Sequence, residues 1–266
     1  MRKIFFICLV LTAVVPCLAQ KTKKEKRDER KQRVNALIKQ EEEGVISYHK
    51  HTVVGLKLTS DGYGGFIEIG RAKSITKALL FQLDISERKH PKEDKQTNPF
   101  IPTSPFIFGK INYFYPVKLG LQQQVLLGNK TNRNGVSVTA NFGGGISLGL
   151  LRPYYLEVNS ANAGSRKTIR YESSDSALFS DGAGLTGLSV SGTGFGKGWK
   201  DIKITPGLYA KTGVRFDYGK YNEMVNALEV GLTGEYYSKK IPQVVFTKPK
   251  QFFIGLYVSV MFGKRK

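Results

Sequence analysis

Residues 252–262 read FFIGLYVSVMF and alternate between two kinds of side chain. The even positions are all large and apolar, whereas Gly255, Tyr257 and Ser259 among the odd positions are small or amphipathic. Period-2 alternation is typical of a β-strand whose two faces meet different environments. An apolar face that ends in Phe near the C-terminus favours the last strand of an outer-membrane β-barrel, although a strand of a soluble sandwich shows the same alternation. We expect this face to carry the C-terminal assembly signal, formed by Ile254, Leu256, Val258, Val260 and Phe262.

The same alternation recurs in seven earlier segments, which brings the expected strands to eight. These segments are 52–59, 66–70, 79–86, 113–122, 136–150, 202–216 and 228–236. Several of them exceed the roughly 9–11 residues that a tilted strand needs to cross a bilayer. The segment 66–70 is shorter, and Gln123 is a polar residue on an otherwise apolar face.

The lengths of the connections test the membrane interpretation. A barrel with an even number of strands has both termini in the periplasm, short turns on that side and longer loops outside. The links at 73–76, 129–133 and 218–221 are short, whereas those near 89–110, 151–201 and 239–249 are long. Only the first outside link, Ser60-Asp61-Gly62, is tight, and Asp-Gly is a strong hairpin signal. The sequence therefore predicts an all-β fold, an eight-stranded antiparallel up-and-down transmembrane barrel over residues 47–266, with three long extracellular loops.

The second face of the expected strands carries charged residues of both signs. An eight-stranded barrel is only wide enough for side chains to fill its interior. We therefore expect these residues to form a network of ion pairs in the lumen, with a conduction path as the alternative. The predicted network consists of Lys57, Glu68, Asp84, Lys118, Lys203, Lys211, Arg215, Glu229 and Glu235.

Residues 1–19 have the features of a secretory signal peptide. Arg2 and Lys3 precede an apolar run that is too short to span a bilayer, and Ala19 ends a small-residue cleavage site. A lipoprotein modified at Cys17 is the less favoured alternative, because the residues before Cys17 are not small. The only other cysteine, Cys8, lies in the same segment, so we expect no disulfide and no thiolate site after cleavage.

Residues 20–46 are crowded with Lys and Arg and also carry a small apolar stripe at helical spacing. They predict a charged periplasmic helix or tail, which is either solvated or in contact with lipid headgroups or a partner protein. The whole chain has a formal net charge of +20. An exported chain rarely meets nucleic acid and no nucleic-acid motif is present, so anionic lipids or sugars are the expected partners.

Candidate chemistry is sparse. His49 and His51 stand two residues apart on one strand face, but no further metal ligand is near them in the sequence. His90 lies close to Glu93 and Asp94, which raises the alternative of a catalytic site at the barrel rim, yet the sequence gives no nucleophile–base geometry there. We therefore expect no catalytic residue, no metal and no cofactor.

Aromatic residues are expected at the outer membrane interface, where one end of the ring is apolar and the other is wet. The predicted interfacial belt consists of Tyr154, Tyr155, Trp199, Tyr236 and Tyr237.

Four segments resemble the small outer-membrane β-barrel proteins of the Bacteroidota, a group related to PorT-like barrels. They are residues 108–112, 147–158, 206–211 and 250–264, within a resemblance that covers roughly residues 50–264. The resemblance implies location in the cell outer membrane and a barrel architecture, and it implies no reaction. The chain departs from many barrels by ending in Lys264-Arg265-Lys266 instead of an aromatic residue.

These observations predict a non-enzymatic outer-membrane barrel that acts as a structural, interaction or envelope-machinery accessory protein. Its expected partners are outer-membrane lipids, the barrel-assembly machinery and an envelope protein bound through the N-terminal helix or the outer loops. A narrow pore or transporter for small solutes is the alternative, and a membrane hydrolase or acyltransferase with its site at the rim is less favoured.

Overall fold

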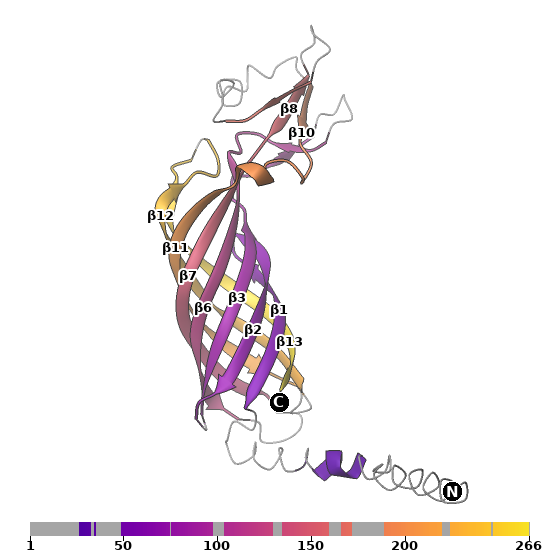
Figure 1. Cartoon of the computed structure of the whole chain (residues 1–266), viewed down its shortest axis with the longest axis vertical. Coiled ribbons are helices and arrows are strands. Elements are labelled where there is room, and N and C mark those ends of the chain that lie inside the picture. Colours follow the sequence, from indigo (N-terminus) through magenta and orange to yellow (C-terminus); the bar gives the residue numbers. More distant parts are fainter. Residues whose placement is uncertain are drawn as a thin grey trace, which may run out of the picture.

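The computed structural model describes residues 27–32, 35, 49–74, 76–97, 104–129, 135–159, 166–171, 189–219, 224–245 and 247–265. Within these residues, eight long antiparallel strands close into a barrel (Figure 1). The strands are β1 (Lys50–Thr59), β2 (Gly62–Ala72), β3 (Lys77–Arg88), β6 (Asn112–Gly128), β7 (Ser137–Pro153), β11 (Lys203–Asp217), β12 (Met224–Ile241) and β13 (Lys250–Arg265). Each of them pairs with its neighbours along the chain, and β1 pairs with β13. The predicted eight-stranded up-and-down barrel is confirmed.

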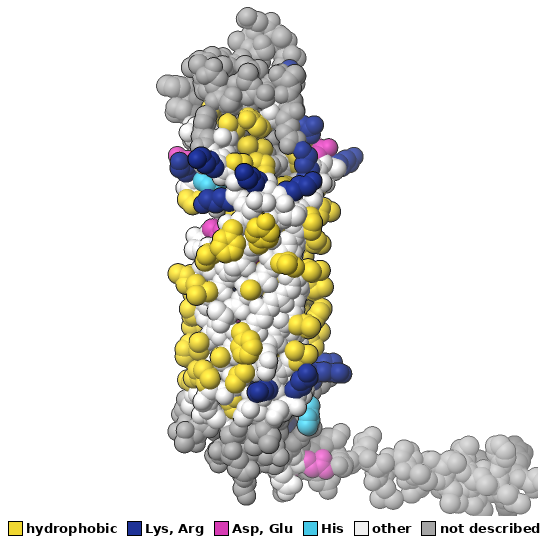
Figure 2. Space-filling model, turned by 90° about the vertical axis from the view of Figure 1, so that its left-hand side faces the viewer, with side chains coloured by type: hydrophobic (Ala, Val, Ile, Leu, Met, Phe, Trp, Pro, Cys, Tyr) yellow, Lys and Arg dark blue, Asp and Glu magenta, His cyan; other side chains and the backbone are white. Residues whose placement is uncertain are grey.

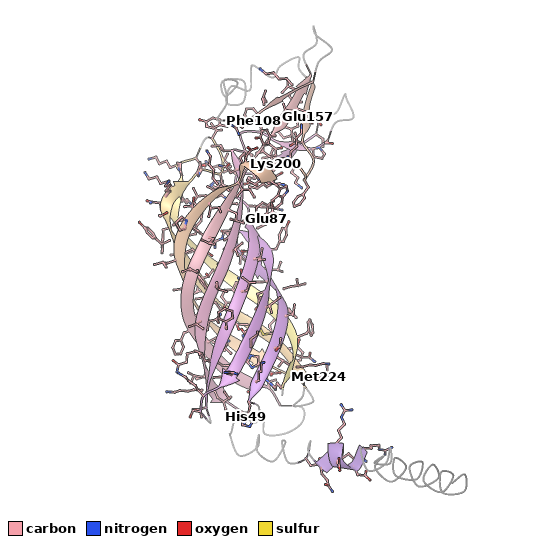
Figure 3. All side chains as sticks on the ribbon, viewed as in Figure 1. His49, Glu87, Phe108, Glu157, Lys200 and Met224 are labelled. Atoms are coloured by element: carbon pink, nitrogen blue, oxygen red, sulfur yellow. The ribbon has the colours of Figure 1, made fainter. Side chains whose placement is uncertain are left out.

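The two ends of the barrel differ in their connections. The links from β2 to β3, from β6 to β7 and from β11 to β12 lie at the end where β1 begins and β13 finishes. We call the opposite end the mouth. Figure 3 shows His49 and Met224 at the end with the short links, and Glu87 near the mouth. Three longer connections leave the mouth and carry β4 (Lys95–Gln96), β5 (Phe106–Ile107), β8 (Leu156–Asn159), β9 (Arg166–Ile169), β10 (Ser189–Gly192) and the short 3-10 helix η3 (Trp199–Asp201).

Strand alternation separates an apolar outer face from a polar interior. On β13, Leu256 is 61% exposed whereas its neighbour Tyr257 is 2% exposed. The five residues of the predicted assembly signal all lie on the outer face of β13. Figure 2 shows the resulting apolar side chains spread over the wall of the barrel, with Lys and Arg gathered above and below them. Among the exposed apolar residues are Val54, Ile67, Phe81, Leu121, Ile146, Leu208 and Leu232. This outer face is suited to hydrocarbon, as in a membrane-spanning barrel.

Glycines inside the wall make room for large luminal side chains. A Cβ atom at Gly120 would lie 2.5 Å from the hydroxyl oxygen of Tyr209, and one at Gly213 would lie 2.5 Å from that of Tyr257. Both tyrosines are buried in the barrel. The interior is therefore filled by aromatic rings as well as by charged groups, as the width of an eight-stranded barrel requires.

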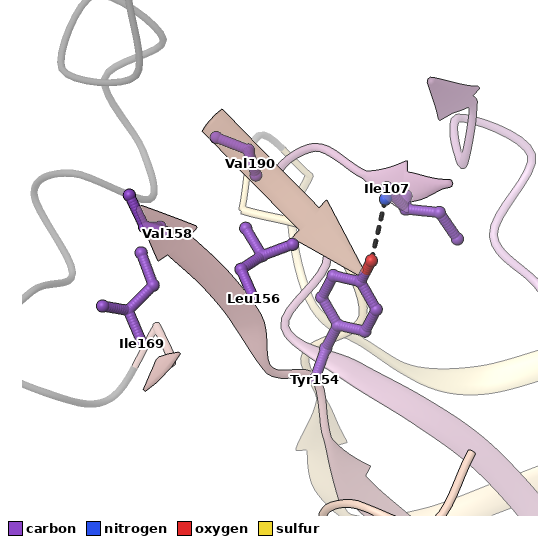
Figure 4. Close-up of a cluster of buried hydrophobic side chains, with 6 residues drawn as sticks. All are labelled: Ile107, Tyr154, Leu156, Val158, Ile169 and Val190. Atoms are coloured by element: carbon purple, nitrogen blue, oxygen red, sulfur yellow. Dashed lines mark hydrogen bonds between the residues drawn. The ribbon is translucent and has the colours of Figure 1, made fainter. Parts of the chain in front are cut away.

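Beyond the mouth, β8 pairs with β9 and β10 in a separate three-stranded sheet. Its buried residues form a small apolar core that includes Tyr154, and the hydroxyl oxygen of Tyr154 accepts a hydrogen bond from the backbone N–H of Ile107 at 2.9 Å (Figure 4). The core residues are Ile107, Tyr154, Leu156, Val158, Ile169 and Val190. We call this sheet and its core the cap.

The observed bounds differ from the predicted loops at two places. β7 continues to Pro153 and β12 continues to Ile241, so the barrel wall reaches further than residues 151 and 239 suggested. Residues 27–32 are helical, as is residue 35. The rest of the predicted charged segment 20–46, and the whole predicted signal peptide 1–19, lie outside the described residues. Among the residues described, no helix is long and apolar enough to cross a bilayer.

Candidate functional site: the filled lumen and the covered mouth

The structure places eight of the nine predicted network residues inside the barrel, where all eight are buried. Lys203 is the exception and is exposed. It has the inward parity of β11, but it is the first residue of that strand and stands at the mouth. The prediction was wrong for Lys203 because alternation gives the direction of a side chain and not its height along the barrel axis.

The half of the lumen nearer the termini is organised around Arg215. Its two terminal guanidinium nitrogens donate to the two carboxylate oxygens of Glu68, each at 2.8 Å, and the guanidinium also contacts Glu229 at 2.7 Å. Glu229 pairs in turn with Lys211 at 2.9 Å and accepts a hydrogen bond from Tyr257 at 2.7 Å. Bidentate contacts of this kind fix both position and orientation.

The half of the lumen nearer the mouth holds a second set of ion pairs. Lys57 pairs with Asp84, and Lys118 lies 2.6 Å from Glu235 and 3.8 Å from Asp84. Arg88 reaches Glu235 at 3.3 Å and Asp61 at 3.2 Å. Charges contributed by β1, β3, β6 and β12 therefore meet across the interior, where opposite signs neutralise one another.

Sequence reasoning missed Arg88 and the luminal tyrosines. Arg88 shares the parity of Asp84 on β3, so the alternation contained the signal, but the predicted strand ended at residue 86. Tyr257 and Tyr237 have the inward parity of their strands, and both donate to luminal glutamates. Amphipathic tyrosines serve this role because the ring fills space while the hydroxyl group satisfies a carboxylate.

The mouth itself is covered by a bridge between two connections. Val244 pairs with Lys110, the N–H of Ile111 donates to the carbonyl of Gln243 at 2.8 Å, and the N–H of Val245 donates to Gly109 at 2.8 Å. Lys110, Gln243 and Val244 are all buried. We call residues 109–112 and 242–245 the mouth bridge, and it joins the β5–β6 link to the β12–β13 link.

The buried side chain of Glu93 holds the mouth bridge through Lys110. Lys110 donates to Glu93 at 2.5 Å and lies 3.9 Å from the ring centroid of Tyr113. Burial lowers the pKa of Lys110, against the opposing effect of Glu93. Glu93 also accepts a hydrogen bond from the backbone N–H of His90 at 3.1 Å.

The hydrogen bonds of His90 among the described residues lie within its own loop. Its ring nitrogen Nδ1 accepts a hydrogen bond from the backbone N–H of Lys92 at 3.2 Å. Burial lowers the pKa of His90, and the positive charge of Lys250 lowers it further. The contacts of His90 among the described residues are those of a loop residue.

His49 and His51, which the sequence places two residues apart, differ in burial. His51 is buried and lies 3.2 Å from Glu68, whereas His49 is exposed before β1 begins. Among the residues that the structure describes, no group of three or more His, Cys, Asp and Glu side chains has the arrangement of a metal site.

An aromatic cluster holds the cap connection against the mouth. The guanidinium of Arg152 lies 4.2 Å from the ring centroid of Tyr113, 4.7 Å from that of Phe195 and 5.0 Å from that of Trp199. Arg152 also donates to the carbonyl of Phe195 at 2.5 Å. Because Arg152 lies next to the last residue of β7 and Phe195 precedes η3, these contacts fix the returning chain over the rim.

The predicted interfacial belt is only partly on the surface. Tyr236 and Trp199 are exposed, and Tyr155 is half-buried and donates to Asp201 at 2.7 Å. The prediction was wrong for Tyr237, which points into the lumen, since consecutive residues of a strand cannot share a face. It was also wrong for Tyr154, which leaves the barrel after Pro153 and is buried in the core of the cap.

Comparisons with known proteins give a likeness of shape without a family. No protein-family model matches the sequence, and no curated protein matches it. The chain is similar to neisserial surface protein A, with a TM-score of 0.36, 12% identity, and 82% of this chain and 96% of that chain covered. It is similar to the N-terminal β-barrel domain of Pseudomonas aeruginosa OprF, with a TM-score of 0.33, 12% identity, and 81% and 98% covered. It is also similar to Ail, the attachment invasion locus protein of Yersinia pestis, with a TM-score of 0.36, 8% identity, and 81% and 98% covered.

Proposed function

We propose that this chain is a non-enzymatic outer-membrane barrel whose cap is an interaction surface for another component of the cell envelope. One arrangement carries the proposal: the interior is filled by paired charges and tyrosines, the mouth is bridged, and a folded sheet stands beyond it. A barrel that is filled in this way anchors the cap in the membrane and presents it at the surface.

The location and orientation of the barrel are part of this proposal. The apolar outer face supports insertion in a bilayer, because a large exposed apolar surface is unstable in water. Long connections at one end and short ones at the other support an extracellular cap and periplasmic termini. The signal peptide, recognition by the barrel-assembly machinery through β13, and the Bacteroidota resemblance remain predictions that agree with this placement.

A replacement of the cap tests its role. In the test variant, residues 154–198 are replaced by a short Gly-Ser linker that joins β7 to η3, and envelope proteins crosslinked to each form are identified. We expect the variant to keep the barrel, seen as heat-modifiable gel mobility, and to lose its crosslinked partners. An unchanged set of partners would show that the cap is not the interaction surface.

A narrow pore is the second candidate, because charged and polar side chains line much of the lumen. The ion pairs weigh against it, since an ion that passes must separate charges already in contact. Planar-bilayer recordings decide between the two. We expect no single-channel steps from the purified barrel, and steady unitary conductance would favour the pore.

A further inference from the structure

The hairpin between β12 and β13 carries a cluster of lysines at the outer rim. Lys239 and Lys240 stand near the end of β12, and Lys248 and Lys250 stand where β13 begins. All four are exposed, and the pairing of Ile241 with Lys250 places the two strand ends side by side. We call these four residues the β12–β13 rim. Figure 2 shows Lys and Arg side chains gathered above the apolar wall of the barrel.

Among the residues that the structure describes, no acidic side chain forms an ion pair with a lysine of the β12–β13 rim. Within the described part of the chain, the ion pairs join luminal residues, loop residues or Lys197 with Glu157. Lys250 also contributes to the lowered pKa of His90, although burial is the larger cause and Glu93 opposes it. A group of exposed lysines with no ion-pair partner among the described residues favours an anionic ligand.

Apolar side chains lie on the outer face of the same two strands, β12 and β13. Tyr236 on β12 pairs with Phe252 on β13, and Ile254 follows on β13. Their side chains are 53%, 56% and 67% exposed, respectively. Cations above an exposed apolar wall match a molecule with an anionic headgroup and hydrocarbon chains.

The backbone of β13 offers further polar groups at this height. Strand β1 ends at Thr59, which pairs with Tyr257, whereas β13 begins seven residues earlier at Lys250. Among the described residues, the one hydrogen bond joining this stretch to the β1–β2 turn runs from the N–H of Ser60 to the carbonyl of Leu256. No described strand pairs with the β1 side of residues 250–255. Hydroxyl groups of a sugar suit such backbone donors and acceptors.

We propose that Lys239, Lys240 and Lys250 bind the phosphate groups of a phosphorylated glycolipid in the outer leaflet, with its acyl chains lying along Tyr236, Phe252 and Ile254. Lysine is a compact point charge that suits phosphate. The inference rests on the proposed orientation of the barrel, because the rim must face the leaflet that holds this lipid.

The test measures binding to the purified full chain in nonionic detergent. The probes are a diphosphorylated, multiply acylated glucosamine disaccharide lipid and its dephosphorylated form. We expect tight binding of the phosphorylated probe only. The triple variant Lys239→Gln/Lys240→Gln/Lys250→Gln should weaken it on the order of 100-fold at low salt, because each lysine near a charged surface contributes about 1 kcal/mol and tenfold is about 1.4 kcal/mol.

A matched variant controls for general attraction. Arg71, Lys73 and Lys77 are equally exposed but lie at the end of the barrel near the termini. Arg71→Gln/Lys73→Gln/Lys77→Gln removes the same charge and should change binding by less than about threefold if the site is local. Replacing the three rim lysines by Arg should restore binding, and heat-modifiable mobility should confirm that every variant is folded.

Four results would overturn the inference. The first is an equal loss of lipid affinity in the two triple variants, and the second is equal affinity for the dephosphorylated lipid. The third is competition by inorganic phosphate at the same concentration as the lipid. The fourth is that the amides of residues 250–255 are protected from hydrogen exchange by a strand of another protein and not by the lipid. Lipid binding is measured on the folded barrel in detergent and does not depend on whether the barrel conducts ions. Ion conduction would therefore contradict the proposed function without contradicting the lipid site.

Discussion

Arg215 lies between two carboxylates in the interior of the barrel and satisfies both. Its replacement by Met keeps the length of the side chain but leaves Glu68 without its bidentate partner. Removing one member of a buried ion pair typically costs about 3–5 kcal/mol, because the remaining charge stays buried. We expect Arg215→Met to lower the free energy of unfolding by about that amount in denaturant titrations of the barrel in detergent.

The exposed Lys264 on β13 is the control for Arg215. Lys264→Met should change the free energy of unfolding by less than about 0.5 kcal/mol, as surface substitutions usually do. The double variant Arg215→Met/Glu68→Gln should lose less than the two single variants added together, because the two groups share one interaction. Strict additivity would mean that the contact between Arg215 and Glu68 does not contribute to stability.

His90 titrates in the loop outside the barrel wall. Its pKa is lowered from the usual value, first by burial and then by Lys250, so the folded state binds fewer protons than the unfolded state near pH 6. Stability should therefore rise with pH through that range and then level off above the unfolded pKa. In NMR titrations, we expect Lys250→Gln to raise the pKa of His90 and Lys248→Gln to change it less. A midpoint above that of an unstructured peptide would contradict this account.

At the scale of elements, the mouth bridge depends on backbone hydrogen bonds. Val245→Pro removes the N–H that donates to Gly109, whereas Val245→Ala keeps it. We expect the Pro variant to speed hydrogen exchange at Ile111 and Asn112, whose amides both point at the carbonyl of Gln243. The Ala variant should resemble the wild type. Equal exchange in all three proteins would show that the bridge is not held by these bonds.

The cap has a core of its own, against which Tyr113 of barrel strand β6 packs. Leu156 is fully buried in it, and Leu156→Ala should destabilise the cap by about 2–5 kcal/mol through lost packing and an unfilled cavity. Because no residue of this core belongs to the eight barrel strands, we expect protease to cleave the cap sooner while heat-modifiable mobility is kept. A variant that loses both at once would show that cap and barrel unfold as one unit.

At the scale of the whole molecule, the orientation follows from the asymmetry of the two ends. Both cysteines lie in residues 1–19, so single cysteines can be placed elsewhere as reporters. We expect a membrane-impermeant maleimide to label Thr193→Cys in intact cells and to label Lys31→Cys only after the outer membrane is opened. The reverse pattern would refute the proposed orientation.

The strands and their directions could be predicted from alternation, because one face meets lipid and the other meets polar groups. The partners of each luminal charge could not, since pairs such as Arg215 with Glu68 join strands that are not neighbours. The cap was missed for another reason. Its strands have four residues each, too few for a period to be recognised among glycines and serines. Tyr237 has the inward parity of β12, so its place in the lumen could have been predicted from the alternation.

The pairing of β1 with β13 also sets the order in which this chain can mature. Leu58 meets Val258 across that seam, so the cylinder cannot be sealed before the final segment has been synthesised and delivered. Until then, the strands at the seam have free edges, and free strand edges pair readily with other chains. A chain that stops before residue 250 would therefore remain an open sheet that tends to aggregate. Only a chain that contains the sixteen residues of β13 can close the barrel.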